Sequence, residues 1–151
     1  MFQDEYRDLL SGPAVETVAD AAYGVMEYAD VTGLTDAAEF DAPETSLTYH
    51  GHCNQKALNR DFHAAATLRA AGYEVDHLDS SCCGMAGSFG YEAEHYELSK
   101  AIGEILYEKV EASPGETVVA PGASCRSQLS DDDFEGEHPP HPVEKLREAL
   151  A

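Results

Sequence analysis

The sequence is short of basic residues. Its 151 residues include 9 Lys and Arg against 29 Asp and Glu, which gives a formal net charge of −20. The acidic residues recur along the whole chain, and a surface of this sign repels a phosphate backbone, which excludes nucleic acid as a partner. Such a surface suits a cytosol with molar salt, where the Debye length shrinks to about 3 Å. We therefore expect a halophilic source, with a basic partner as the alternative explanation.

Long hydrophobic runs are also missing. No apolar stretch approaches the roughly 18–20 residues that a transmembrane helix needs. The first five residues, MFQDE, are acidic where a secretory signal peptide would be basic and then apolar. With 43% hydrophobic residues, the chain can still form one domain with one sizeable core. We predict a soluble, cytoplasmic protein without a transmembrane segment.

Cysteine is scarce, but its placement is informative. The chain has four, namely Cys53, Cys82, Cys83 and Cys125. An even number allows disulfides, and a bond between the adjacent Cys82 and Cys83 is a strained alternative. Thiols in a cytosolic chain stay reduced, however, and clustered cysteines there indicate metal or redox chemistry.

The first 40 residues have a helical pattern. Val15, Val18, Ala22 and Val25 repeat at helical spacing, and Pro43 then ends the pattern because it forces its predecessor out of the helical region. We predict an N-terminal helical segment over residues 1–43, packed on the core. Residues 44–151 are predicted to form a cysteine-rich α/β domain, so that the chain is a single compact domain overall.

From residue 44 onward a short apolar run, a polar or glycine-rich turn and an amphipathic helix follow one another repeatedly. Strands are predicted at 46–50, 73–78 and 117–120, with a last extended segment at 138–141. Helices are predicted at 54–71, 92–111 and 142–150. This alternation implies βαβ units, and we predict a three-layer, Rossmann-like parallel sheet of about four strands flanked by helices.

Apolar spacing predicts the buried face of the two longer helices. In the first helix the predicted stripe is Leu58, Phe62, Ala65 and Leu68, with Gly72 as the C-cap. In the second it is Leu98, Ile102, Ile105 and Leu106. Pro142 suits the first turn of the terminal helix.

Every cysteine follows a predicted strand. Three strand ends, separated by 28 and 41 intervening residues, would deliver four thiols to the carboxyl edge of the sheet, where ligands bind in open α/β folds. Four thiolates suit an iron–sulfur cluster or Zn²⁺. The adjacent Cys82 and Cys83 can serve one site only if the backbone turns sharply there, and Gly84 supplies that freedom.

Several other polar residues lie near the predicted site. His50 and His52 flank Cys53, and His52 is a candidate auxiliary ligand, although a strand-end histidine is more commonly a hydrogen-bonding surface residue. Lys56 either lines the site or sits in a solvated helical turn, and Arg126 either screens an anionic cluster or forms a surface salt bridge. His77 and His95 have weaker claims to metal.

Three motifs in the chain resemble a known family. They are Gly51-His52-Cys53-Asn54-Gln55-Lys56, the glycine-rich run from Cys82-Cys83-Gly84 to Gly90, and Ser124-Cys125-Arg126-Ser127-Gln128. They resemble the CCG cysteine-rich domain of heterodisulfide reductase and of the iron–sulfur subunits of glycolate oxidase and anaerobic glycerol-3-phosphate dehydrogenase. The chain is most similar to the C-terminal domain of FAD-linked oxidoreductases of the D-lactate and D-2-hydroxyglutarate dehydrogenase type.

The resemblance implies an electron-transfer role. In such a protein a cluster held by Cys53, Cys82, Cys83 and Cys125 accepts electrons from a flavin that oxidises a 2-hydroxy acid. FAD is expected only in a partner domain or subunit, beside further iron–sulfur domains, and the resemblance allows peripheral association with a membrane complex. The chain alone is then not a complete enzyme and has no catalytic residue of its own. The alternative is a zinc-stapled or metal-free docking module.

The chain departs from the family at one position. The family pattern usually ends in Cys-x-x-Cys, whereas Gly122-Ala123-Ser124-Cys125 keeps only the second cysteine. A five-thiolate site cannot form from four cysteines, and we predict a [4Fe–4S] cluster with four thiolate ligands, or zinc.

Overall fold

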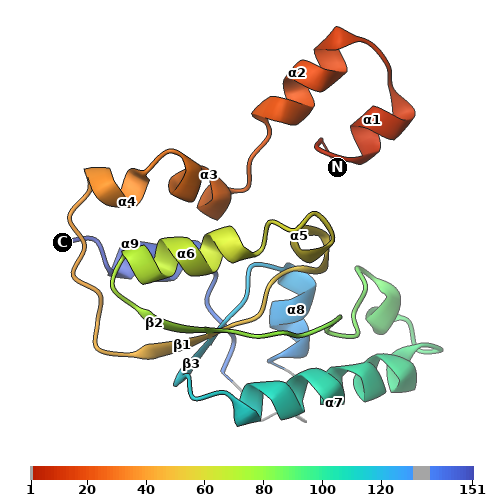
Figure 1. Cartoon of the computed structure of the whole chain (residues 1–151). Coiled ribbons are helices and arrows are strands. Elements are labelled where there is room, and N and C mark those ends of the chain that lie inside the picture. Colours follow the sequence, from red (N-terminus) through yellow and green to blue (C-terminus); the bar gives the residue numbers. More distant parts are fainter. Residues whose placement is uncertain (1, 131–136) are drawn as a thin grey trace.

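A small parallel sheet organises the chain. The computed structural model describes residues 2–130 and 137–151. Three strands, β1 (Ser46–Tyr49), β2 (Glu74–His77) and β3 (Thr117–Val119), form a parallel sheet in the order β2-β1-β3 (Figure 1). The central strand β1 is the first in sequence, and both edge strands pair with it. The predicted α/β class and parallel sheet are confirmed.

Helices account for most of the remaining regular structure. The described helices are α1 (Glu5–Leu9), α2 (Pro13–Ala21), α3 (Val25–Val31), α4 (Leu34–Ala37), α5 (Cys53–Ala57), α6 (Phe62–Ala70), α7 (Tyr96–Ala112), α8 (Ala123–Gln128) and α9 (Pro142–Glu148), with a 3-10 turn, η1 (Phe89–Tyr91). Pro142 occupies the first turn of α9, as predicted.

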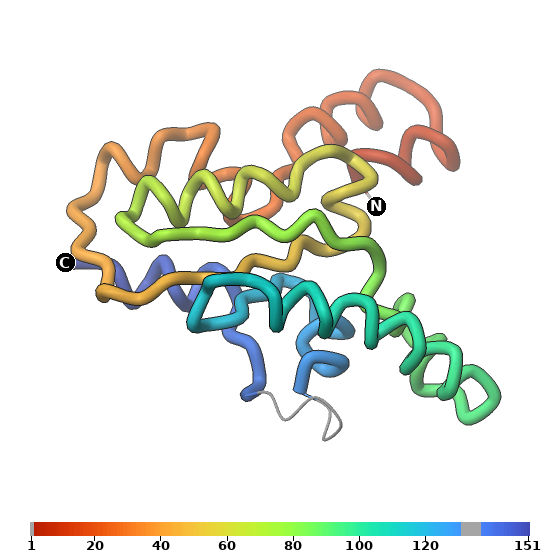
Figure 2. The backbone as a smooth tube through the Cα atoms, turned by 60° about the horizontal axis from the view of Figure 1, so that its bottom comes forward, coloured from red at the N-terminus to blue at the C-terminus, as the bar shows by residue number. Residues whose placement is uncertain are grey.

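The sheet separates two apolar cores. Helix α6 joins β1 to β2 and, together with α3 and α9, covers one face; α7 joins β2 to β3 and covers the other (Figures 1 and 2). The first core contains Leu47 and Leu68. The second contains Leu106 and Leu129 and also includes two of the four cysteines, Cys83 and Cys125.

The N-terminal helices differ in what they contact. Helix α3 is tied to α6, because the Thr67 hydroxyl donates to the Met26 carbonyl at 3.0 Å and His63 pairs with Asp30 at 2.6 Å. The α1–α2 pair is held by local ion pairs around Arg7 and projects away from the sheet (Figure 1). The division of the chain at residue 43 stays a prediction.

The predicted fourth strand does not form. Residues 138–141 run beside β3, where the Ala120 amide donates to the Pro140 carbonyl at 3.2 Å. The neighbouring prolines at 139, 140 and 142 have no amide hydrogen, so this segment cannot donate the regular series of backbone hydrogen bonds that a strand makes with its neighbour. The described part of the sheet therefore has three strands.

The helix predicted over 54–71 is broken. Helix α5 ends at Ala57 and α6 begins at Phe62, because Asn59 takes a left-handed conformation with φ of 53°. The break changes the helical phase, so Phe62 is 45% exposed, while Leu68 is buried as expected. The C-cap of α6 is Ala71, one residue before the predicted Gly72. Gly72 follows the cap in a left-handed conformation with φ of 104°, and its amide donates to the Arg69 carbonyl.

The buried face of α7 also differs from the prediction. Leu98 and Ile105 are 55% and 52% exposed, whereas Ser99 and Gly103 are buried. Small residues face inward because the loop after Cys83 presses on the backbone of α7. A Cβ atom at Gly84 would lie only 2.2 Å from the Ser99 carbonyl oxygen.

Candidate functional site

The four cysteines lie on the three loops that leave the carboxyl ends of the strands. Cys53 is the first residue of α5, just after β1, and Cys125 is the third residue of α8, just after β3. Cys82 and Cys83 lie in the loop after β2. Because the strands are parallel, their carboxyl ends meet at one edge, and the structure brings the thiols together there.

The thiols form two interacting pairs. Cys53 interacts with Cys82, and both are half-buried, while Cys83 interacts with Cys125, and both are buried. The hydrogen bond from Cys125 lowers the pKa of the Cys83 thiol, whereas burial raises the pKa of Cys53. All four cysteines are free, so the structure contains no disulfide between Cys82 and Cys83.

The spacing of the sulfurs can be compared with the needs of a metal. No three of the four sulfur atoms, all in the described part of the chain, lie within 4.8 Å of one another. A tetrahedral zinc site has Zn–S bonds of about 2.3 Å, which place its sulfurs about 3.8 Å apart. The thiols therefore do not form a preformed tetrahedral zinc site in this structure.

The loop after β2 turns sharply at Gly84. Its φ is 97°, and the Gly84 amide donates to the Cys82 sulfur at 3.3 Å. Close contact with the Ser99 carbonyl leaves no space for a side chain at this position. The turn directs Cys83 into the core and leaves Cys82 nearer the surface, so the two adjacent thiols differ in burial.

A polar network lies behind the thiols. His50 is completely buried, its Nδ1 shares a 2.7 Å hydrogen bond with the Ser80 hydroxyl, and it interacts with the Cys83 thiol. Burial lowers the pKa of His50. Lys56 donates to the same hydroxyl at 2.9 Å. No sequence pattern singles out Ser80. Of the two interpretations of Lys56, the solvated turn is wrong, because its ammonium lies in this partly buried network.

His52 serves as the N-cap of α5. Its Nδ1 accepts a hydrogen bond from the Asn54 amide at 3.3 Å, which places the ring proton of the neutral imidazole on Nε2. Ligation by the neutral ring through Nε2 would require the proton to move to Nδ1, which would break this hydrogen bond. The ring lies close to Gly122, where a Cβ would be 2.5 Å from His52 Cδ2 and 3.0 Å from the Cys125 sulfur. This contact accounts for glycine at the position where the family usually has cysteine.

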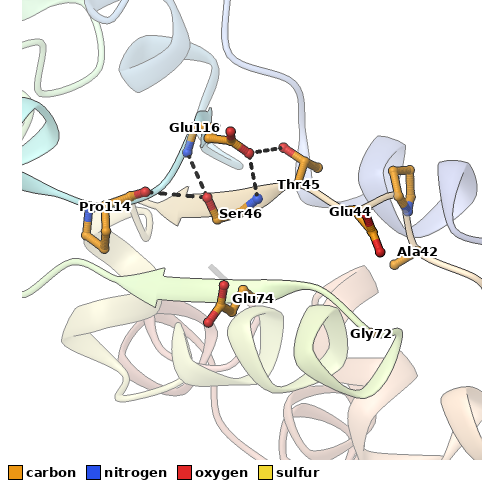
Figure 3. A pocket seen from close by; sticks show the side chains of 9 residues that line it. Ala42, Glu44, Thr45, Ser46, Gly72, Glu74, Pro114 and Glu116 are labelled. Atoms are coloured by element: carbon orange, nitrogen blue, oxygen red, sulfur yellow. Dashed lines mark hydrogen bonds between the residues drawn. The ribbon is translucent and has the colours of Figure 1, made fainter.

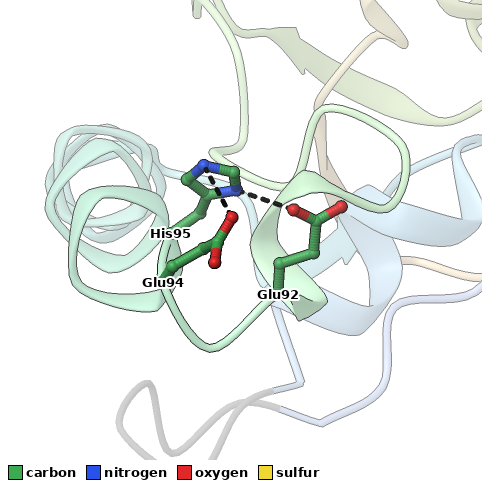
Figure 4. A group of neighbouring side chains, drawn as sticks. All are labelled: Glu92, Glu94 and His95. Carbon is green, nitrogen blue, oxygen red and sulfur yellow. Dashed lines mark ion pairs between the residues drawn. The ribbon is translucent and has the colours of Figure 1, made fainter.

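The remaining candidates lie in ion pairs outside the thiol cluster. Arg126 donates to the Pro139 carbonyl at 2.6 Å and forms a salt bridge with Glu144 at 3.5 Å. His77 pairs with Asp61 at 2.8 Å. His95 faces Glu92 and Glu94 on an exposed loop before α7 (Figure 4).

A cavity of about 540 Å³ lies at the opposite edge of the sheet, between the amino ends of the strands (Figure 3). Glu116 accepts hydrogen bonds there from the Thr45 hydroxyl and the Ser46 amide, at 3.2 and 3.3 Å. Its lining includes Glu74 but none of the cysteines. The cavity is thus separate from the thiol site.

Comparison with known proteins assigns the sequence to a family. Residues 47–130 match the family model of the CCG cysteine-rich domain, and this match covers more than half of the chain and contains all four cysteines. The chain belongs to the CCG cysteine-rich domain family. The family that the three motifs indicated is confirmed.

Curated relatives of the chain include two dehydrogenases of Escherichia coli K12. The chain is 34% identical over 107 residues to a subunit of anaerobic glycerol-3-phosphate dehydrogenase, covering 70% of this chain and 26% of that protein. It is 33% identical over 108 residues to D-2-hydroxyglutarate dehydrogenase, covering 70% of this chain and 10% of that protein. The chain thus spans about a quarter of the first relative's length and a tenth of the second's.

No solved structure matches the chain significantly. Among residues 2–130 and 137–151, no helix has the length and apolar character that crossing a bilayer requires.

Proposed function

We propose that this CCG domain holds a [4Fe–4S] cluster on Cys53, Cys82, Cys83 and Cys125 and transfers electrons within a flavin-dependent 2-hydroxy-acid dehydrogenase. The observation that carries the proposal is the meeting of four free thiols, from three separate loops, at one edge of the sheet. A bound cluster supplies reversible one-electron chemistry, which thiols alone do not.

The donor set and its surroundings are compatible with a cluster. Four thiolates are the usual ligands of a [4Fe–4S] cluster, and no three of the four sulfurs are gathered as closely as a single zinc ion would hold them. The Gly84 amide already donates to the Cys82 sulfur, and such bonds stabilise sulfur that carries negative charge. Cys53 and Cys82 are half-buried, so this side of the site lies near the surface, where an electron donor can approach.

The relatives support a role beside partner domains or subunits. Two of them are named as dehydrogenases, one of them as a subunit, and the chain corresponds to a small part of each. We infer that a flavin-containing domain or subunit, and further iron–sulfur domains, work with this one in the cytoplasm. FAD would be bound by that partner, which would also select the substrate.

Anaerobic reconstitution tests the proposal. The chain is incubated with ferrous iron and sulfide, desalted and analysed for metal, sulfide and the EPR spectrum after reduction with dithionite. We expect a brown protein with about four iron and four sulfide per chain and a signal on reduction. A colourless protein that binds one zinc and takes up no iron and sulfide would contradict the cluster and support a zinc-stapled docking module.

A further inference from the structure

Lys56 occupies an unusual position for a lysine in an acidic protein. It is one of only four lysines, and it lies on α5, three residues after Cys53. Its side chain is half-buried, and its ammonium nitrogen donates to the Ser80 carbonyl at 2.6 Å and to the Ser80 hydroxyl at 2.9 Å. A third contact, to the Ser81 carbonyl, is 3.4 Å long.

These hydrogen bonds link two of the three cysteine loops. Ser80 and Ser81 directly precede Cys82 and Cys83, so the ammonium holds their backbone against the helix that carries Cys53. The Ser80 hydroxyl also shares a hydrogen bond with the buried His50. Lys56 therefore restrains the approach of the Cys82–Cys83 turn to the rest of the site.

Lys56 also places a positive charge near the thiols. Its three hydrogen-bond partners are two carbonyls and a hydroxyl, none of which carries a charge. Burial lowers the pKa of Lys56, and negative charge on its neighbours Cys53, Asp61 and Cys125 opposes that change. A positive charge that is partly withdrawn from water acts more strongly on neighbouring anions than a solvated one does.

We propose that Lys56 is a positioning residue that fixes the Cys82–Cys83 loop and raises the reduction potential of the bound cluster. This inference rests on the proposed function. Reduction adds one negative charge to a cluster that already carries thiolate ligands, and a fixed positive charge stabilises the reduced form more than the oxidised form. Removing the charge therefore lowers the potential.

The test is a redox titration of reconstituted protein, followed by EPR, with four chains compared at one salt concentration. Lys56→Met removes the charge and the hydrogen bonds, and Lys56→Arg keeps the charge. Lys109→Met is the matched control, because the exposed Lys109 ammonium donates to the Asp79 carbonyl of the same loop. It also removes one positive charge.

We expect Lys56→Met to lower the equilibrium constant for reduction about tenfold, which corresponds to about 59 mV for a one-electron couple. Lys56→Arg should change that constant by less than about threefold, and so should Lys109→Met, because solvent and salt screen an exposed charge. If Lys56→Met retains no cluster, Lys56→Gln takes its place in the titration, since it is neutral but keeps an amide donor.

The outcomes separate this inference from the proposed function. If the Lys56 variant (Lys56→Met or its substitute Lys56→Gln) had the same reduction potential as Lys109→Met, the electrostatic role would be overturned while the cluster stayed in place. A lower cluster yield with an unchanged potential would also overturn it, because a purely structural lysine gives that result. A wild-type chain that assembles no cluster would refute the proposed function and, with it, this inference.

Discussion

Gly84 offers a sharp test of how the Cys82–Cys83 turn is built. In Gly84→Ala the added methyl group meets two obstacles. The backbone has φ of 97°, and the new Cβ would lie 2.2 Å from the Ser99 carbonyl oxygen of α7. That neighbour is backbone within a helix, so it cannot rotate away, and the loop or the helix must move.

The size of the effect can be estimated from these two obstacles. A left-handed conformation costs an alanine roughly 1–2 kcal/mol. Insertion of a methyl group into packed surroundings costs about 1–3 kcal/mol more. We therefore expect Gly84→Ala to lower the free energy of unfolding by about 2–5 kcal/mol. Gly87→Ala is the matched control, because Gly87 has φ of 73° but nothing within 4 Å of its Cβ position, so only the first cost of roughly 1–2 kcal/mol applies.

Urea denaturation of the metal-free protein in molar KCl measures both variants against wild type. Iron content after reconstitution gives a second comparison, and Gly84→Ala should retain less iron than Gly87→Ala, since it displaces Cys83. Equal losses of stability in the two variants would refute the close contact between the turn and α7. Equal iron contents would show that the turn does not position the ligand.

Three further predictions concern the thiols, the charge and Gly122. Replacing any one of the four cysteines by serine should remove most of the bound iron, and unchanged iron in one variant would exclude that residue from the ligand set. The thermal midpoint should rise steadily from dilute buffer to molar KCl, because 29 acidic and 9 basic residues leave a net charge of −20 to be screened; a flat curve would instead favour a basic partner. Gly122→Cys should destabilise the protein by about 1–3 kcal/mol, since its Cβ would lie 2.5 Å from His52. In a His52→Ala background, which lacks both that contact and the N-cap of α5, Gly122→Cys should cost less stability than it does in the wild type and permit a changed EPR spectrum. A stable single variant would contradict the contact.

The strands could be predicted from the sequence because they are short apolar runs between turn residues. The residue pattern of β1, β2 and β3 was sufficient to place the four thiols at one edge of the sheet. The resemblance of the three motifs to CCG domains was correct as well. Both results depend on local patterns, which a single sequence records directly.

The features that the sequence did not predict depend on contacts between distant parts of the chain or on the conformation of a single residue. Leu98 and Ile105 lie on a plausible apolar stripe, but close approach of the Gly84 loop turns Ser99 inward instead. The left-handed Asn59 broke a helix whose apolar spacing was continuous. Likewise, only the fold shows that Lys56 reaches Ser80, which lies 24 positions further along the chain.

The strand order has a consequence for how the protein is made. Cys53 and Cys125 are 72 positions apart, and the strands that precede them pair side by side, with β2 on the other side of β1. A nascent chain lacks a complete set of thiols until β3 has left the ribosome and docked. Partly synthesised or partly folded molecules therefore have fewer thiols with which to capture metal. Detachment of either edge strand disperses the set again, so possession of the full site marks a molecule whose sheet is complete.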